Sequence, residues 1–277
     1  MNIMFCTDIH GSSERYKKIL NIHKEFDLTI IGGDILPKNI RSDSIHSVQR
    51  KFVTNFLPEY FSKFKTDLII DFANDDHYSN YNDFVNIVSK YNHIHRSHLN
   101  STKINNITFT GMNFVPDYPF GLKDWCRKDN DEYIINPKQI SIPCTSTKSG
   151  YKNIENLEKY YNERMSIENV LDSLLPGHID NKTICLFHSP PRTLGLDICY
   201  DRRAVGSRAV TNWILKNQPK LVLCGHIHES PKVSGIYYNY LEKTLCIQPG
   251  QSYYRDELTY CCFDLSNIEK TLEIRTI

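Results

Sequence analysis

Five short stretches of the sequence carry carboxylate, amide or imidazole side chains in patterns that suit metal binding. Asp8 and His10 lie two residues apart in "CTDIHG", and His226 and His228 repeat this spacing in "LCGHIHES". Residues two apart on an extended chain point to the same side, so Asp8 and His10 can bind one cation. Three single residues complete the set: Asp34 in "IGGDI", Asn74 in "FAND" and His188 in "LFHSPP". Mixed oxygen and imidazole ligands suit Mn²⁺, Fe, Zn²⁺ or Ni²⁺ rather than a cysteine-rich structural zinc site.

Each of these stretches follows an apolar run that is typical of a buried strand. The runs are "NIMFCTD", "DLTIIGGD", "TDLIIDF", "KTICLFHS" and "KLVLCGHIH". In α/β sheets, ligands bind outside the carboxyl ends of the strands. The two glycines before Asp34 also let the backbone come close to such a site. The sequence therefore predicts that the five stretches meet at one metal site.

The intervening segments carry helix and turn signals. We predict helices at about 12–25, 44–64, 81–91, 154–175 and 207–218, and a hairpin over 103–113 that turns at Asn105-Asn106. Closing strands are predicted over 232–236, 244–250, 259–265 and 271–277. This alternation predicts a layered α/β fold with two sheets and helices outside. We expect one domain over 1–277, with an irregular and helical elaboration around 113–180.

Composition narrows the functional classes. The formal net charge of +1 gives no indication of a nucleic-acid partner, and no run approaches the roughly 18 apolar residues of a membrane span. The nine cysteines form no C-x-x-C motif and several lie in apolar runs, so we interpret them as buried thiols in a reducing compartment. No secretory signal is recognisable at the start. We expect a cytoplasmic protein that does not enter the membrane; nothing in the sequence indicates its oligomeric state.

Taken in order, the motifs "DIH", "GGD", "AND", "FHSPP" and "GHIH" resemble those of the calcineurin-like metallophosphoesterase superfamily. The pattern there is D-x-H, G-D, G-N-H-[DE], H and G-H-x-H. The stretches "FTGMNFVPDYPFGL" and "PKLVLCGHIHES" are further similar to a small bacterial and archaeal branch of phosphoesterases. The resemblance implies a calcineurin-like four-layer sandwich, in which two stacked mixed β-sheets are flanked by helices.

The resemblance also implies a dinuclear metal centre. One metal would be held by Asp8, His10 and His228, and the second by Asn74, His188 and His226, with Asp34 bridging both. Mn²⁺ is favoured, with Fe, Zn²⁺ and Ni²⁺ as alternatives. A hydroxide held between the two metals would hydrolyse a phosphodiester or a small phosphate ester, such as a nucleotide.

The motif after the third strand departs from the family pattern. Asp75 stands where the family has a histidine that meets the phosphate and is often assigned as general acid. We predict catalytic roles for Asp75, as a protonated carboxyl, or for His77, as a displaced imidazole. A substrate with a good leaving group would need neither, and plain turn chemistry is the alternative for Asp75, Asp76 and His77.

Three arginines near a predicted helix start are candidates for substrate binding: Arg202, Arg203 and Arg208. Ser207 would cap that helix, whose N-terminus could face an anion. A charged loop in solvent explains the same residues equally well.

Two other functional classes stay open at this point. A non-catalytic scaffold would keep the fold and lose ligands, whereas all seven ligand positions here carry the expected residue type. A nuclease acting with a partner is a further alternative, against which the near-zero net charge argues. The segment "GGDILPKN" lacks the D-R-G of the Ser/Thr protein phosphatases, which disfavours protein dephosphorylation.

Overall fold

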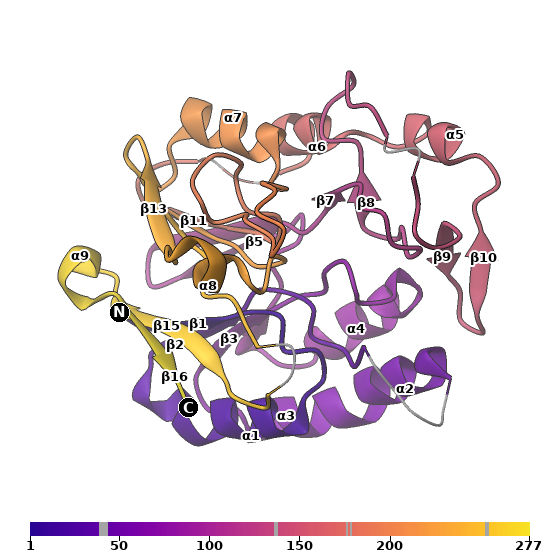
Figure 1. Ribbon diagram of the computed structural model, residues 1–277. Helices are drawn as coiled ribbons and strands as arrows, with labels where there is room; N and C mark the ends of the chain where they lie inside the picture. Colours follow the sequence, from indigo (N-terminus) through magenta and orange to yellow (C-terminus); the bar gives the residue numbers. More distant parts are fainter. Residues whose placement is uncertain (39–43, 136–137, 176, 178, 253–254) are drawn as a thin grey trace.

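The computed structural model describes residues 1–38, 44–135, 138–175, 177, 179–252 and 255–277. Two stacked six-stranded sheets form its centre, with helices on their outer faces (Figure 1). The first sheet has the order β16 (Glu273–Thr276), β15 (Thr259–Asp264), β1 (Asn2–Cys6), β2 (Leu28–Ile31), β3 (Asp67–Ile70) and β4 (Ile94–His95). The second has the order β13 (Tyr238–Leu241), β14 (Thr244–Ile247), β12 (Leu221–Leu223), β11 (Thr183–Phe187), β6 (Ile107–Met112) and β5 (Ser101–Ile104).

Both sheets are mixed, with parallel strands at the centre. Strands β1, β2, β3 and β4 run parallel, and β15 and β16 add an antiparallel edge. In the second sheet β6, β11, β12 and β14 run parallel, while β5 and β13 are antiparallel to their neighbours. The predicted fold class, two stacked mixed sheets flanked by helices, is therefore confirmed. The predicted hairpin is also confirmed, since Asn105 and Asn106 have the positive φ values of a tight two-residue turn.

The core lies in layers because neighbouring residues of each strand face opposite sides. Ile3 and Phe5 of β1 pack in the cluster between the two sheets. Met4 and Cys6, which alternate with them, belong to the cluster beneath the helices. Because the central parallel strands are buried on both faces, they read in the sequence as continuous apolar runs.

The helices cover the outer faces of the two sheets. Figure 1 shows α1 (Ser13–Ile22) and α3 (Leu57–Lys63) along the first sheet, and α6 (Ile167–Ser173) and α7 (Arg208–Asn217) along the second. The remaining helices are α2 (Ile45–Lys51), α4 (Tyr81–Val88), α5 (Leu157–Asn162), α8 (Ser230–Ser234) and α9 (Ile268–Thr271), with short 3₁₀ turns at His23–Glu25 and Tyr78–Asn80. The helix predicted over 44–64 is continuous but contains a π-helical turn, Phe52–Phe56.

Two predicted elements are wrong in detail. The strand predicted over 232–236 is mostly helix α8, because Pro231 suits the first helical turn and Gly235 ends it with φ 77°. The helix predicted over 154–175 is broken into α5 and α6. The side chain of Ser166 accepts a hydrogen bond from the Asn169 amide and starts a second helix there.

Around 113–180 the chain forms two small two-stranded sheets in addition to α5 and α6. These sheets pair β7 (Val115–Pro116) with β8 (Cys126–Arg127), and β9 (Cys144–Ser146) with β10 (Tyr151–Asn153). Most of the nine cysteines are buried and all are unpaired. Across the described ranges, every helix is too short or too polar to cross a membrane.

Candidate metal centre

Four predicted ligands from three strand ends converge at one edge of the stacked sheets. Asp8 and His10 follow β1, Asp34 follows β2 and His228 follows β12. One ligand atom from each of these four residues lies within 4.8 Å of all the others. The strands that precede them are separated by up to 215 residues in sequence, so this grouping is a product of the sheet topology.

Individual contacts define the first half of the centre. His10 Nε2 lies 2.9 Å from His228 Nε2, and His228 Nε2 lies 3.2 Å from Asp8 Oδ1. Asp34 Oδ2 is 3.9 Å from His10 Nε2. Two ring nitrogens and two carboxylates that face one common point are a suitable ligand set for a divalent cation.

Two histidines of the second predicted set, His188 and His226, lie beside Asp34 and Asp8. His188 Nε2 is 3.6 Å from Asp34 Oδ2 and 3.8 Å from Asp8 Oδ1. The His188 and His226 rings are 5.5 Å apart, and the backbone amide of His226 donates to both oxygens of Asp8. Because Asp34 contacts a histidine of each set, it has the position expected of a shared ligand.

Two buried polar atoms of the second predicted set test whether these residues fit a metal. Asn74 Oδ1 and His188 Nε2 are buried and have no hydrogen-bond partner among the described residues. Buried polar groups are nearly always paired, so such atoms call for a ligand. His188 Nδ1 lies 3.0 Å from the carbonyl oxygen of Gly32, which orients the ring as the outer partners of metal-binding histidines do. The donor set therefore fits a cation.

Four of the seven predicted ligands also share an unusual backbone conformation. Asp8, His10, Asp34 and His226 all have positive φ, between 48° and 71°. The left-handed region costs a residue with a β-carbon roughly 1–2 kcal/mol. Strain of this kind is concentrated at functional sites, where the surrounding structure maintains it. At these strand ends the left-handed turn redirects each side chain toward the centre.

Two glycines are required by close backbone approach. At Gly33, with φ 116°, an added β-carbon would lie 2.7 Å from His188 Nδ1 and 2.6 Å from the β-carbon of Ala73. At Gly225 it would overlap the hydroxyl of Thr7 and lie 2.8 Å from Asp8 Oδ2. The expectation that the glycines before Asp34 bring the backbone close to the site is therefore correct for Gly33.

Charge at the centre favours bound cations. Burial raises the pKa of the Asp8 and Asp34 carboxyls, but the facing histidines outweigh it and hold both pKa values well below the usual range. Burial alone would lower the pKa of His188, yet the Asp34 and Asp8 carboxylates raise it to about 9.

Burial dominates at the two other shielded imidazoles. It lowers the pKa of His10 to about 4, although Asp34 and Asp75 oppose the shift, and it lowers that of His226 to about 3 with help from His188. These two rings are therefore neutral near pH 7, which is the form in which histidine binds a metal.

The buried side chain of Asp76, for which a plain turn role was the alternative, connects the two loops that carry Asp34 and Asn74. Asp76 accepts hydrogen bonds from the backbone amides of Ile35, Leu36 and Ala73, at 2.7–3.0 Å. It thereby ties the loop after Asp34 to the loop that carries Asn74. Its sequence signal, one of two adjacent aspartates after a strand, is the same as that of an ordinary turn.

Other supporting residues were missed. Gln248 donates from Nε2 to the carbonyls of Ile227 and Gly225, which fixes the turn of the G-H-x-H motif. The buried guanidinium of Arg15 donates to the carbonyls of Asp8 and Ile9. For Gln248, a glutamine inside the apolar run "TLCIQPG" is a weak sequence signal of a supporting role. Arg15 carries no such signal, because most of the groups that it contacts come from distant segments of the chain.

Asp75 and His77, the two predicted catalytic residues, have different surroundings. The Asp75 carboxylate forms an ion pair with Lys38 and lies 4.0 Å from His10 Nδ1, so it borders the metal centre. The His77 ring packs against His46, and its Nε2 lies 3.1 Å from the Tyr151 hydroxyl of β10. Burial lowers the pKa of His77 to about 4. The catalytic roles of both residues stay predictions.

The three candidate arginines lie at the surface. Arg202, Arg203 and Arg208 are exposed, and Arg203 forms an ion pair with Asp201. The grouping of all three around a phosphate stays a prediction.

The N-terminus of α7, beside these arginines, is already bound by a carboxylate from another part of the chain. Ser207 caps α7 by accepting from the Val210 amide, as predicted. The Asp129 carboxylate accepts from the amides of Arg208 and Ala209 and from the Ser207 hydroxyl. The anion at this N-terminus is therefore a side chain of the 113–180 segment.

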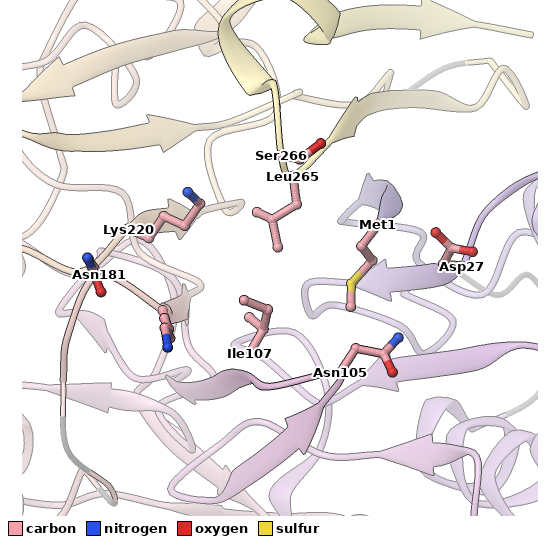
Figure 2. A pocket seen from close by; sticks show the side chains of 9 residues that line it. Met1, Asp27, Asn105, Ile107, Asn181, Lys220, Leu265 and Ser266 are labelled. Carbon is pink, nitrogen blue, oxygen red and sulfur yellow. The ribbon is translucent and has the colours of Figure 1, made fainter.

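A surface pocket of about 480 Å³ (Figure 2) lies at the amino ends of the strands, away from the candidate metal centre at their carboxyl ends. It is lined by Met1, Asp27, Asn105, Ile107, Asn181, Lys182, Lys220, Leu265 and Ser266. Most of these residues precede the parallel strands whose carboxyl ends carry the metal ligands. The pocket is therefore separate from the candidate metal centre.

Comparison with known proteins shows the family of the chain and its fold. The family model for calcineurin-like phosphoesterases matches residues 1–230. No curated protein matches the chain. The crystal structure of TT1561 of Thermus thermophilus is 16% identical, with 99% of this chain and 97% of that chain covered and a TM-score of 0.55. At this identity the likeness shows the fold.

Two more distant structures also align over the whole chain. A dimetal phosphatase from Danio rerio is 12% identical, with 98% of that chain covered and a TM-score of 0.48. An archaeal phosphodiesterase is 13% identical, with 99% of that chain covered and a TM-score of 0.41. Both scores are too low to support an argument about activity. Because the family model covers most of the sequence, including every predicted ligand, the chain belongs to the calcineurin-like phosphoesterase family.

Proposed function

We propose that the protein is a phosphoesterase that uses two divalent metal ions. One ion would be bound by Asp8, His10 and His228, and the other by Asn74, His188 and His226, with Asp34 as the shared ligand. The observation that carries the proposal is the position of Asp34, whose Oδ2 lies within 4 Å of a histidine from each set. Mn²⁺ is the proposed metal, with Fe, Zn²⁺ and Ni²⁺ as alternatives.

Two bound dications would supply a clamp for the phosphate oxygens and a water of lowered pKa. The residues of the chain give this chemistry its geometry. The Asp75 backbone amide donates to Asp34 Oδ1 over 2.8 Å and so holds the shared carboxylate in place. The Gly32 carbonyl orients His188, and the neutral ring of His10 offers its lone pair to a cation.

The proposed substrate is a phosphodiester or a small phosphate ester, such as a nucleotide. Membership of the family supports the reaction class, and the donor set supports the metal requirement. We also propose a cytoplasmic location, which the nine unpaired thiols support.

A substrate panel with a ligand variant tests the proposal. The Mn²⁺-loaded protein and Asp34→Asn are compared on p-nitrophenyl phosphate, its bis-ester, cyclic nucleotides and single-stranded DNA. We expect hydrolysis of at least one ester, and a loss of kcat of about 100-fold or more in the variant, because Asp34 is shared by both ion sites. The surface variant Asp172→Asn, on the outer face of α6, is the matched control.

Metal content, measured by mass spectrometry on the same samples, separates the outcomes. Hydrolysis by the wild type that Asp34→Asn abolishes, together with reduced metal content, supports the proposal. A protein that holds two metals and hydrolyses nothing on the panel contradicts it and favours a scaffold role.

A further inference from the structure

The family's phosphate-facing histidine is replaced in this chain by an ion pair. Asp75 stands at that position, and its carboxylate contacts the ammonium group of Lys38. Lys38 lies four residues after Asp34, in the loop that leaves β2. The two side chains come from different loops, so the pair exists only in the folded protein.

The position of the pair relative to the metal centre is defined by contacts at both ends of Asp75. Its backbone amide donates to Asp34 Oδ1 over 2.8 Å. Its carboxylate Oδ2 lies 4.0 Å from His10 Nδ1. The Lys38 ammonium, which contacts the same carboxylate, therefore lies at the border of the centre.

The pair is also open to solvent on the Lys38 side. The Lys38 side chain is 42% exposed, whereas that of Asp75 is 18% exposed. A small phosphate ester that approaches the centre from solvent can reach the ammonium group. Burial lowers the pKa of Lys38, but the Asp75, Asp34 and Asp8 carboxylates outweigh this effect, and the net shift is upward. The side chain is therefore positively charged near neutral pH.

A carboxylate alone at this position would repel a phosphate. An ion pair with lysine cancels that charge, and an ammonium group is a good partner for phosphate oxygens.

We propose that Lys38 is the side chain that contacts the phosphate group of the substrate, and that Asp75 is a positioning residue that holds the Lys38 ammonium at the edge of the metal centre. On binding, the phosphate shares the ammonium with the carboxylate. The inference rests on the proposed phosphoesterase function, and it assigns to Lys38 a role that no motif in the sequence indicates.

Binding of inorganic phosphate to the Mn²⁺-loaded protein tests the inference without requiring turnover. We expect Lys38→Met to weaken phosphate binding, measured by isothermal titration calorimetry, by about tenfold, and Lys38→Arg to stay within about threefold of the wild type. Metal content and melting temperature should not change. Lys63→Met, which removes an exposed lysine paired with Glu59 on α3, is the matched control.

A double variant tests the role of Asp75. In Lys38→Met the carboxylate is left uncompensated and repels the anion, so Lys38→Met/Asp75→Asn should recover part of the lost phosphate affinity. If the ion pair has only a structural role, Lys38→Met and Asp75→Asn, each made alone, should lower the melting temperature and leave phosphate affinity unchanged. In kinetics, Lys38→Met should raise KM more than it lowers kcat.

The outcomes separate this inference from the proposed function. Phosphate affinity of Lys38→Met within twofold of the wild type overturns the inference, and hydrolysis by the wild type would then leave the function standing. Phosphate binding that depends on Lys38, in a protein that hydrolyses none of the esters, supports the inference and contradicts catalysis. No phosphate binding by the metal-loaded wild type overturns the inference, and it counts against the proposed function only when none of the esters is hydrolysed.

Discussion

At the scale of single residues, the centre depends on backbone positions that tolerate little change. Asp8, His10, Asp34 and His226 have left-handed φ values, so the chain accepts this cost at four predicted ligands. Gly33 shows how closely the ligand loops pack, because hydrogen is the only side chain that fits between Ala73 and His188. We therefore expect substitutions here to affect stability and metal binding together.

We expect Gly33→Ala to destabilise the protein by about 3 kcal/mol, since left-handed strain adds to a steric overlap with His188. Chemical denaturation measures the change, and metal content should fall as His188 is displaced. Two control variants separate the causes. Gly235→Ala, at φ 77° in open space, should cost about 1 kcal/mol, and Gly150→Ala, with nothing nearby, should stay within about 0.5 kcal/mol. Equal effects at Gly33 and Gly235 would exclude the steric explanation.

At the scale of elements, the 113–180 segment is joined to the second sheet through the start of α7. Asp129 is buried and accepts hydrogen bonds from the Ser207 hydroxyl and from two backbone amides of the helix. The Ser207 amide in turn donates to the carbonyl of Pro190, in the loop that follows His188. The cap thus connects the elaboration, the helix and a ligand loop.

Asp129→Ala should therefore destabilise the protein by about 2 kcal/mol, because it leaves buried donors without acceptors at a helix N-terminus. The free energy of unfolding in guanidinium chloride measures the loss. Asp131→Ala, which removes an exposed carboxylate that accepts from Asn169, should cost at most about 0.5 kcal/mol. Similar values for the two variants would show that the cap is not important to stability.

At the scale of the whole molecule, the centre joins the two halves of the sandwich. Asp8 and Asp34 follow strands of the first sheet, whereas His188, His226 and His228 follow strands of the second. A cation bound between them would link the two sheets at their carboxyl edge. Metal binding and global stability should therefore be coupled.

We expect removal of divalent cations by a chelator to lower the melting temperature, and Mn²⁺ to restore it. At a metal concentration 100-fold above the Kd, binding contributes about 2.7 kcal/mol, which corresponds to roughly 5 °C for a chain of this size. Differential scanning calorimetry measures the shift. In Asp34→Asn the shift should be much smaller, and an equal shift there would place the stabilising cation elsewhere.

The strands and the ligand set were accessible from the sequence because both depend on local patterns. Apolar runs marked the central strands, and the residues directly after them are of types that commonly bind metals. The convergence of Asp8, His10, Asp34 and His228 then followed from the topology of parallel sheets. The prediction for helix α8 was wrong because its five residues, Ser230–Ser234, are too few for a periodic pattern.

By itself, the sequence determined the sheet architecture, the residue types of the candidate metal centre and their order along the chain. Only the tertiary structure decided which charged groups surround that centre. Asp75 pairs with Lys38, from 37 residues earlier, and Asp129 caps a helix 79 residues later. Such contacts leave no signal in the local sequence, because a charged loop residue has the same neighbours in sequence whether its side chain lies in solvent or contacts a distant partner. The partner is set by how the loops pack once both sheets have formed.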